Sequence, residues 1–209
     1  MVYNAQKEVK TMQNKLILAS SSPRRREILS LAGYCFDVAS SSAEELSPGV
    51  LPPEQTVVQN ALAKAADIAF RPENRGRTVI GADTLVFSAG KTLGKPHNAA
   101  EAAEMLSALS GKTHTVFTGY AVITGGEAES GYCRTEVKFR ELTRAEIERY
   151  VRTGEPMDKA GAYGIQGYGC VLVESVCGDY FNVMGLPVST LYGILANRGI
   201  FPLCPADGD

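Results

Sequence analysis

The sequence predicts an α/β fold in which helices flank a mixed β-sheet and the chain folds as two lobes around a cleft. Two observations support this prediction. Apolar runs of strand length alternate with stretches whose apolar residues recur at helical spacing, and two later runs have the pattern of a long antiparallel hairpin. The chain has 209 residues without internal repeats or a Gly/Ser linker, so we expect a single domain over 15–200. Residues 1–14 are predicted to be a disordered N-terminal extension, and 201–209 a loose C-terminal tail.

The first elements of the domain are a strand and a helix that follows it at once. Leu16 to Ala19 is an apolar run, and Pro23 suits the first position of a helix that Gly33 ends. Cys35 to Ala39 is predicted to be a short strand. A Ser- and Pro-rich loop then leads to a second helix, which Pro53 opens.

The second helix is followed by a buried strand and by further alternating elements. Its apolar positions keep helical spacing at Val57, Ala61, Ala65 and Ile68, and the strand covers Thr78 to Phe87. The next predicted elements are a turn at Ala89-Gly90-Lys91, a helix that Asn98 and Glu101 cap and that ends at Gly111, and a hairpin of Thr115 to Ile123 with Gly131 to Phe139 across Gly125-Gly126. After the hairpin we expect a helix that Thr143 and Glu146 cap and that ends at Gly154, then a glycine-rich loop from Glu155 to Gly169 and a run from Cys170 to Val176. A turn at Gly178-Asp179 leads into Tyr180 to Val183, and a final helix begins at Pro187.

The start of the first helix breaks a local rule. Ser20-Ser21-Ser22-Pro23-Arg24-Arg25-Arg26 places three cations in a first turn that is already positive, at a cost of about 0.3–1 kcal/mol for each charge. Free backbone N–H groups, serine hydroxyls and guanidinium groups all bind anions. We therefore favour a phosphate site, with a solvated basic helix end as the alternative.

Other polar residues lie where packing alone would not place them. Asp83 is inside an apolar strand, and a buried carboxylate needs a partner, a metal or a proton, unless it caps a neighbouring loop. Lys64 lies beside the apolar stripe of its helix, where a surface lysine with a buried stem explains it nearly as well. The loop Met157 to Gly167 surrounds a charged pair and an amide with small residues, which is typical both of ligand-binding and of plain flexible loops.

Charge and cysteine content exclude several classes of protein. The net charge of −2 argues against a broad nucleic-acid surface, and no apolar run approaches the ~20 residues that cross a bilayer. Five widely spaced cysteines without a C-x-x-C pair suggest neither a disulfide framework nor a zinc site, so we expect a cytoplasmic protein. His97 and His114 are both interpreted as surface residues.

These residues together resemble the Maf family of nucleotide pyrophosphatases over about Lys15 to Leu195. The markers are Ser20-Ser21-Ser22-Pro23-Arg24-Arg25, Gly81-Ala82-Asp83-Thr84, Lys95-Pro96, Thr118-Gly119, and Gly154-Glu155-Pro156 through Gly167. The resemblance implies an elongated, curved mixed sheet with flanking helices, as in Maf and ITPase-like folds, and a deep cleft between two lobes. It also implies metal-dependent hydrolysis of a nucleoside triphosphate to the monophosphate and pyrophosphate.

The resemblance also implies roles for single residues. Asp83 matches the catalytic aspartate, and Arg24, Thr84 and Gln166 match the positions that determine substrate specificity. Further cleft positions are matched by the phosphate- or substrate-binding residues Ser22, Arg25, Lys64, Lys95 and Lys159, and by Glu45, which with Asp83 is expected to hold Mg²⁺ or Mn²⁺. The Ile165-Gln166-Gly167 form is typical of the branch that acts on dTTP and UTP. CTP and modified pyrimidine nucleotides are further candidate substrates.

Two other functions stay open at this point. The first is a nucleotide-binding regulator of cell division or septum formation with little turnover, which the family resemblance also suggests. The second is a nucleic-acid binder built on the arginine-rich helix, which the net charge and the lack of interleaved aromatic residues disfavour. We expect a nucleoside triphosphate as the partner, no nucleic acid and no membrane, and a homodimer by family likeness.

Overall fold

The structure is a computed structural model that describes residues 16–202. The expected disordered extension over 1–14 lies outside the described residues, as does the expected tail from 203 onward. No helix between 16 and 202 has both the length and the apolar character needed to cross a bilayer.

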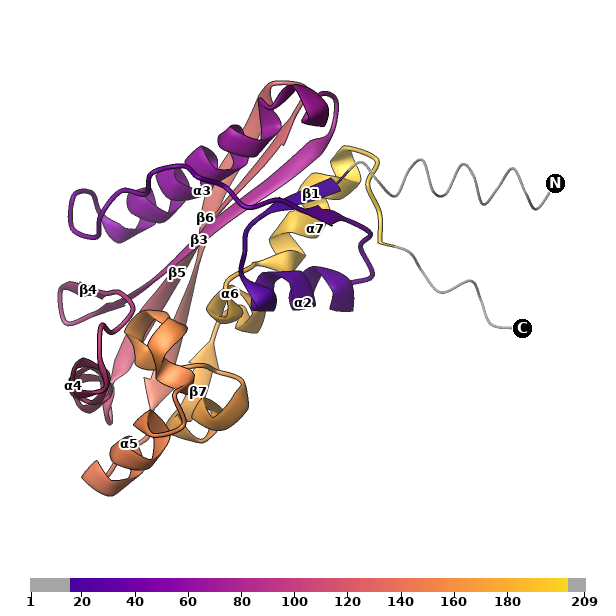
Figure 1. The fold of residues 1–209 in the computed structure, drawn as a ribbon. Helices are drawn as coiled ribbons and strands as arrows, with labels where there is room; N and C mark the ends of the chain where they lie inside the picture. The colour runs from indigo at the N-terminus through magenta and orange to yellow at the C-terminus, as the bar shows by residue number, and fades with distance from the viewer. Residues whose placement is uncertain (1–15, 203–209) are drawn as a thin grey trace, which may run out of the picture.

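The strands are β1 Leu16–Ala19, β2 Asp37–Val38, β3 Thr78–Ser88, β4 Lys91–Leu93, β5 Thr113–Thr124, β6 Glu127–Phe139 and β7 Val173–Cys177. They form one seven-stranded sheet in the order β2-β1-β3-β5-β6-β7, with β4 paired to β3 (Figure 1). β1 pairs in parallel with β2 and β3, whereas β3, β5, β6 and β7 pair antiparallel. The predicted mixed α/β fold is therefore confirmed, and the division into two lobes stays a prediction.

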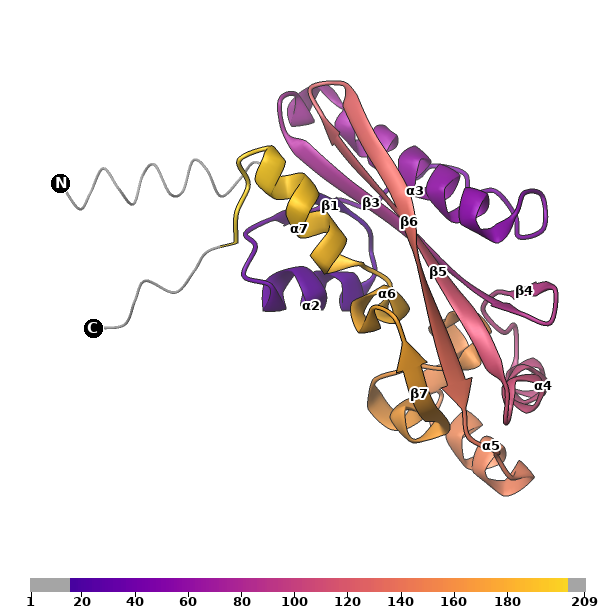
Figure 2. The ribbon, with the colours of Figure 1, turned by 180° about the vertical axis from the view of Figure 1, so that it is seen from behind.

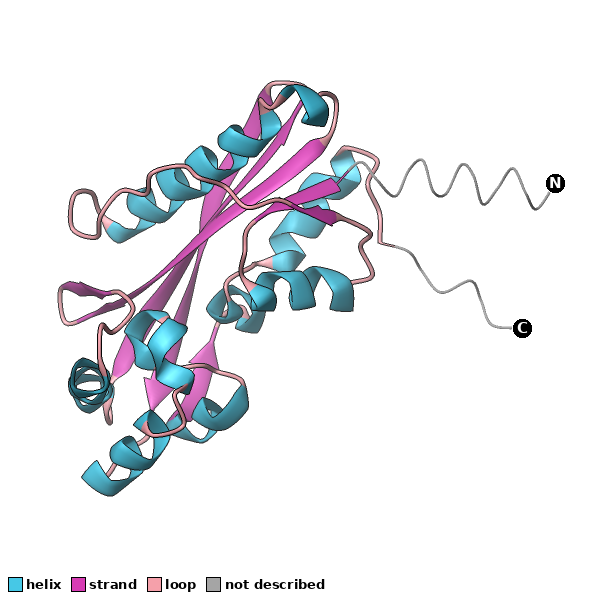
Figure 3. Ribbon diagram, in the orientation of Figure 1, coloured by secondary structure: helices cyan, strands magenta, loops and turns pink. Residues whose placement is uncertain are grey.

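The α-helices are α2 Pro23–Leu31, α3 Pro53–Ala69, α4 Ala99–Leu109, α5 Arg144–Val151, α6 Tyr180–Met184 and α7 Val188–Asn197, and the 3-10 helices are η1 Pro72–Asn74, η2 Glu155–Asp158, η3 Ala160–Ala162 and η4 Gly167–Leu172. Helix α3 covers one side of the long strands, and α2 and α7 lie on the other (Figures 1 and 2). The α-helices and strands alternate along the chain apart from the consecutive pairs β3-β4, β5-β6 and α6-α7, and Figure 3 shows the helices in cyan around the strands in magenta.

The core divides into three clusters, and the pattern of each strand explains which cluster it joins. In β1 every residue is buried, because Leu16 and Leu18 pack toward α2 and α7 while Ile17 and Ala19 pack toward α3. The third cluster is formed by residues of α4 and α5 together with the start of β5 and the end of β6, where Phe139 is fully buried. The sheet is thus held by different helices along its length.

Local signals account for three of the element boundaries. Gly125 and Gly126 both have positive φ, at 60° and 93°, which suits the two-residue turn between β5 and β6. Asn98 accepts the backbone N–H of Glu101 at 2.9 Å, and Thr143 with Glu146 forms a complete capping box. These two helix starts and the hairpin are confirmed.

The structure assigns the two segments whose secondary structure the sequence left open. The run from Cys170 begins in η4, and the strand β7 starts only at Val173. The segment after Asp179 is the helix α6, because the Asp179 carboxylate accepts the backbone N–H of Phe181 at 2.7 Å and Gly185 ends the helix at φ 108°.

The expectation that His114 is a surface residue is wrong. His114 is 2% exposed, its Nε2 lies 2.7 Å from the hydroxyl of Tyr163, and its ring packs edge-on against Phe139. Burial lowers the pKa of His114 from 6.5 to about 4, so the imidazole is neutral at physiological pH. His97 is exposed, as expected.

Candidate functional site

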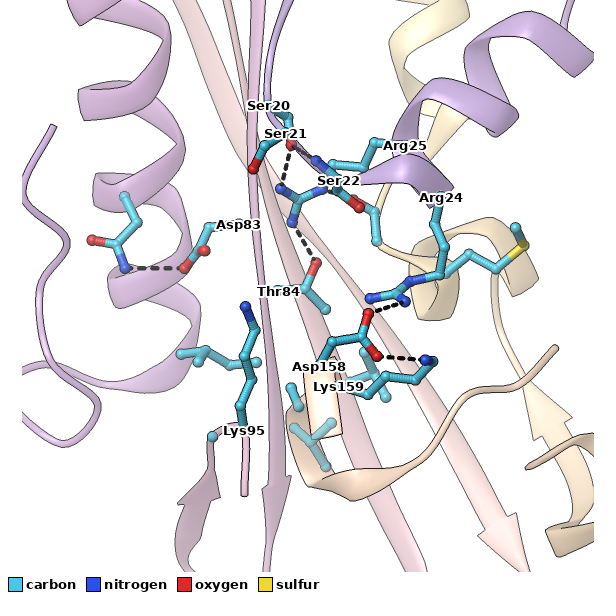
Figure 4. Close-up of a pocket in the computed structure, with 18 of the residues that line it drawn as sticks. Ser20, Ser21, Ser22, Arg24, Arg25, Asp83, Thr84, Lys95, Asp158 and Lys159 are labelled. Carbon is cyan, nitrogen blue, oxygen red and sulfur yellow. Dashed lines mark hydrogen bonds and ion pairs between the residues drawn. The ribbon is translucent and has the colours of Figure 1, made fainter. Parts of the chain in front are cut away.

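A pocket of about 750 Å³ lies beside the middle of β3 (Figure 4). β1 pairs with residues 78–81 of β3, and β4 pairs with residues 86–88. Between them, residues 82–85 have no strand partner on this edge within the described part of the chain. Because side chains alternate along a strand, this open stretch presents Asp83 and Thr84 from opposite faces of the sheet to one cavity.

Every site residue predicted from the sequence lines this pocket: Ser22, Arg24, Arg25, Glu45, Lys64, Asp83, Thr84, Lys95, Lys159 and Gln166. They come from segments far apart in the sequence, including the start of α2, the loop before α3, the open edge of β3 and the loop around η2 to η4. Five cationic side chains and three carboxylates line the cavity, so it favours an anionic ligand.

Asp83 is held by α3. It is 6% exposed, and its Oδ1 accepts a bond from Lys64 Nζ at 2.7 Å while Oδ2 accepts one from Asn60 Nδ2 at 3.0 Å. Lys64 also pairs with Glu45 at 2.9 Å. The ammonium of Lys64 therefore lies where the two carboxylates converge, and Lys64 is not merely a lysine with a buried stem.

Asn60 also holds the loop that carries Glu45. Its Oδ1 accepts the N–H of Leu46 at 2.7 Å, and its Nδ2 donates to the Leu46 carbonyl at 3.3 Å. Sequence reasoning missed Asn60. The available signal was a polar residue on the apolar face of α3, one position before Ala61 and four before Lys64.

Two glycines allow α3 to approach the sheet closely enough for these bonds. A Cβ on Gly81 would lie 2.2 Å from the carbonyl oxygen of Ala61, and one on Gly119 would lie 2.2 Å from the backbone of Val57. Gly119 is also the register partner of Asp83. Because Gly81 and Gly119 have no side chains, α3 can contact the backbone of β3 and β5 next to Asp83.

Thr84 belongs to a polar network on the opposite face (Figure 4). Arg25 donates to Thr84 Oγ1 at 3.1 Å, to Ser20 Oγ at 3.1 Å and to the Gly185 carbonyl at 2.8 Å. Burial lowers the pKa of Arg25, Asp83 opposes this shift and Arg24 adds to it. Arg25 therefore ties α2 to β3 and to the end of α6 in addition to lining the pocket.

The same network continues into the sheet through residues that sequence reasoning did not assign to the site. The Thr84 hydroxyl lies 3.0 Å from that of Thr118, which donates to the Asn182 carbonyl at 2.8 Å. Asn182 is fully buried and donates to Thr135 Oγ1 at 2.9 Å and to the Val116 carbonyl at 3.2 Å. No periodic pattern marks Asn182, because its role depends on strands distant in sequence.

The remaining cations surround the mouth of the pocket. Asp158 accepts bonds from Arg24 at 3.2 Å and from Lys159 at 2.7 Å, so it links α2 to the loop after η2. Burial by itself would raise the pKa of Asp158, but its bonds with Lys159 and Arg24 hold the pKa below the usual value. Lys95 extends into the pocket and has no carboxylate within ion-pair distance among residues 16–202 (Figure 4).

The carboxylates of the pocket could supply only part of the coordination shell of a divalent cation. Glu45 and Asp83 supply carboxylate oxygens, the ligand type that Mg²⁺ and Mn²⁺ prefer, and both face the position of the Lys64 ammonium. Within 16–202 no group of three or more His, Cys, Asp or Glu side chains could hold a metal. A magnesium site here would therefore use two carboxylates completed by water and by oxygens of a ligand.

Comparisons with known proteins show which family the chain belongs to. The family model described as Maf-like protein matches residues 15–198. The chain is 50% identical over 189 residues to the dTTP/UTP pyrophosphatase of Bacillus pumilus, covering 90% of this chain and 99% of that protein. It is 48% identical over 191 residues to the dTTP/UTP pyrophosphatase of Bacillus cereus, and these cover 91% of this chain and 93% of that protein. This chain belongs to the Maf family.

Proposed function

We propose that this protein is a pyrophosphatase that hydrolyses dTTP and UTP to the monophosphate and pyrophosphate. The observation that carries the proposal is the juxtaposition in one pocket of a buried, oriented carboxylate, Asp83, with the cations Arg24, Lys95 and Lys159. A carboxylate that accepts a proton from water, facing groups that bind phosphates, is what phosphoanhydride hydrolysis requires. The names of the Bacillus relatives support the same reaction and base preference.

In this mechanism Asp83 is the general base. Lys64 and Asn60 fix the orientation of its two oxygens, and Asp83 takes a proton from a water whose oxygen bonds to the α-phosphorus. The bond between the α-phosphorus and the bridging oxygen breaks, and pyrophosphate leaves with that oxygen. Because Asp83 is buried beside α3, it stays in position while the rest of the pocket binds the substrate.

The cations stabilise the negative charge that develops on the leaving pyrophosphate. Lys95 has no carboxylate partner among residues 16–202, and Arg24 and Lys159 share only Asp158. We assign these three side chains, with Ser22 and Arg25 at the start of α2, to the triphosphate. A divalent cation held by Glu45, and by Asp83 only if that carboxylate is a ligand and not the base, would supply further positive charge at the phosphates.

Gln166 and Thr84 are the residues that we assign to base recognition, with Arg24 as a third specificity position. A side-chain amide offers both a donor and an acceptor, which match O4 and N3–H of uracil or thymine. UTP and dTTP present the same edge, so both should be substrates. Purines present a different donor pattern and would leave buried polar groups unpaired.

The test is pyrophosphate release from a panel of nucleoside triphosphates with Mg²⁺ or Mn²⁺. We expect UTP and dTTP to be hydrolysed, ATP and GTP to be poor substrates, and CTP and modified pyrimidines to define the range. Asp83→Asn should lower turnover by about 10²–10⁴-fold while nucleotide binding persists. Asp37→Asn is the matched control, because Asp37 pairs with Arg77 outside the pocket.

Binding of UTP without pyrophosphate release would contradict the proposal and support the regulator instead. Turnover by Asp83→Asn equal to that of the wild type would remove Asp83 from its proposed role. The proposal also places the enzyme in the cytoplasm, where the four described thiols, which are free, would stay reduced. Light scattering after size-exclusion chromatography measures whether it is a homodimer.

A further inference from the structure

The loop that carries Gln166 is held by a carboxylate to which no role has yet been assigned. Glu155 begins η2, directly after Gly154 in the left-handed conformation. Its Oε2 accepts the backbone N–H of Tyr168 at 2.8 Å, and its Oε1 accepts that of Gly169 at 3.0 Å. Oε1 also accepts the hydroxyl of Tyr150 at 2.9 Å.

Tyr150 connects the same carboxylate to the other end of the loop. Its hydroxyl accepts the backbone N–H of Gly164 at 3.0 Å while it donates to Glu155. Tyr150 is 5% exposed, and burial raises the pKa of its hydroxyl, which stays protonated and able to donate. The segment 164–169 is thus bound at both ends, with Gln166 between them.

These bonds take over the capping of η4. Gln166 is the N-cap residue of this helix, but its side chain makes no cap hydrogen bond. An N-cap side chain ordinarily accepts a hydrogen bond from the backbone N–H two or three residues later, which here are those of Tyr168 and Gly169. In this structure the Glu155 carboxylate accepts both of these bonds. The Gln166 amide is therefore left for the pocket, which it lines.

Gly167 and Gly169 allow the backbone of the 164–169 loop to pack closely against Glu155 and Tyr150. A Cβ on Gly167 would lie 2.5 Å from Oε2 of Glu155, and its φ of 67° also favours glycine. A Cβ on Gly169 would lie 2.3 Å from the Gly164 carbonyl and 2.7 Å from the Tyr150 hydroxyl. The conformation of the loop and the position of the carboxylate are therefore mutually dependent.

We propose that Glu155, through Tyr150 and the backbone of 164–169, is a positioning residue that aims the Gln166 amide at the base of the nucleotide. This inference rests on the proposed function and deepens it. Glu155 touches loop backbone and not substrate, so its effect is on base recognition. The reacting phosphates are assigned to Arg24, Lys95 and Lys159; Lys159 donates to the backbone carbonyl of Glu155 at 2.8 Å, a bond that a change of the Glu155 side chain leaves in place.

The direct test is Glu155→Gln, which keeps the size of the side chain. A carboxylate accepts at both oxygens, but the glutamine amide has one oxygen and one NH₂ group. The NH₂ group would therefore face the backbone N–H of Tyr168 or Gly169, and two donors cannot form a hydrogen bond. We expect KM for UTP to rise about tenfold, the preference for UTP over ATP to fall by a similar factor, and kcat to change less than about threefold. Glu148→Gln is the matched control, because it removes a carboxylate that pairs with Arg144 on the exposed face of α5.

A double-mutant cycle separates positioning from general stability. If Glu155 acts through Gln166, then Glu155→Gln should add little to the loss of UTP preference in Gln166→Ala. Tyr150→Phe, which removes the bond to Gly164, should show the same coupling. Additive losses, or equal losses for UTP and ATP, would overturn the inference, as would a wild-type UTP preference in Glu155→Gln.

Hydrogen exchange keeps this inference separate from the proposed function. In Glu155→Gln the amides of Tyr168 and Gly169 should exchange at least tenfold faster, while those of β3 and β5 keep their protection. Unchanged exchange in 164–169 would overturn the role of Glu155 whether or not the protein is an enzyme. A wild-type protein that releases no pyrophosphate from any triphosphate would refute the proposed function, while faster exchange in the variant would still support the role of Glu155 in ordering the loop.

Discussion

At the scale of single residues, six of the eight charged side chains that line the pocket are paired with partners of opposite sign, and Arg25 and Lys95 are the exceptions among residues 16–202. Asp83 and Glu45 share Lys64, and Asp158 is shared by Arg24 and Lys159. Burying a charge without a partner costs far more than burying a pair. The buried pair of Asp83 with Lys64 therefore stabilises the pocket, whereas the exposed carboxylate of Asp158 is a competitor for Arg24 and Lys159 if the proposed triphosphate binds them.

The competition predicts the effect of Asp158→Asn. The carboxylate side chain is 62% exposed, so each ion pair contributes little to stability, and its removal frees Arg24 and Lys159 for the substrate. We expect KM for UTP to fall about two- to fivefold with kcat and the melting temperature nearly unchanged. Glu174→Gln, which breaks the surface pair with Lys138, is the control. A higher KM would mean instead that Asp158 orients the cations for binding.

The buried imidazole of His114 predicts a pH dependence of stability. Its pKa falls from 6.5 in the unfolded chain to about 4 in the folded protein, chiefly because of burial. The unfolded chain therefore binds more protons between these values, so stability is lost as the pH falls from 6.5 to about 4, by up to about 3 kcal/mol. Chemical denaturation of His114→Gln should show a flatter pH profile over this range. His97→Gln should keep the wild-type profile, since His97 is exposed; an equal slope in both variants would exclude His114 as its source.

At the scale of elements, the position of α3 on β3 and β5 determines the geometry around Asp83. The helix carries Asn60 and Lys64 one turn apart on the face that meets the sheet. Gly81 and Gly119 remove the side chains that would otherwise separate the helix from the strands. The orientation of the Asp83 carboxylate and the packing of the helix therefore depend on the same contacts.

Gly119→Ala should disturb both the packing of α3 on the sheet and the geometry around Asp83. The added Cβ would lie 2.2 Å from backbone atoms of Val57, which cannot move without the helix. We expect a loss of about 1–3 kcal/mol in the free energy of unfolding, together with at least a tenfold loss of UTP hydrolysis in the protein that still folds. Gly193→Ala in α7 is the control, because its Cβ would meet open space and alanine favours a helix. Wild-type stability and turnover in Gly119→Ala would contradict this account.

At the scale of the whole molecule, the pocket exists because two strands pair with different parts of one longer strand. β1 ends at the register of Gly81, and β4 pairs with β3 only from Val86 to Ser88, with its last residue, Leu93, opposite Val86. The gap exposes both faces of β3 to one ligand, and α2, α3 and the η2–η4 segment supply the walls. A bound nucleotide would contact elements from both halves of the chain and should therefore stabilise the whole fold.

This arrangement predicts how metal and nucleotide act together. Glu45 and Asp83 provide only part of a coordination shell, so Mg²⁺ alone should raise the melting temperature by less than about 2 °C. Mg²⁺ with a non-hydrolysable UTP analogue at about 100 times its Kd should raise it by about 5–10 °C. The corresponding ATP analogue is the control and should give a smaller shift. A full shift with Mg²⁺ alone would indicate a complete metal site in the free protein.

The sequence by itself was sufficient for the features that depend on local chemistry. Pro23, the Thr143–Glu146 capping box and the Gly125-Gly126 turn mark element boundaries through contacts within a few residues, and all three are confirmed. The ten predicted site residues could be named because the family resemblance implies them, eight within its motifs and Glu45 and Lys64 as further cleft positions, and all ten line one pocket. Their catalytic and binding roles stay predictions.

The apolar strand around Asp83 indicated a buried carboxylate, but for other polar residues only the tertiary structure decided which are buried and what they bind. His114 lies in a strand whose alternation does not reveal that Tyr163 and Phe139 cover its ring. Asn182 and Glu155 bond to groups on segments distant in sequence or to the backbone of a loop without a periodic pattern. Local propensity extends over a few residues, whereas burial and hydrogen-bond partners depend on how strands and helices far apart in the chain meet.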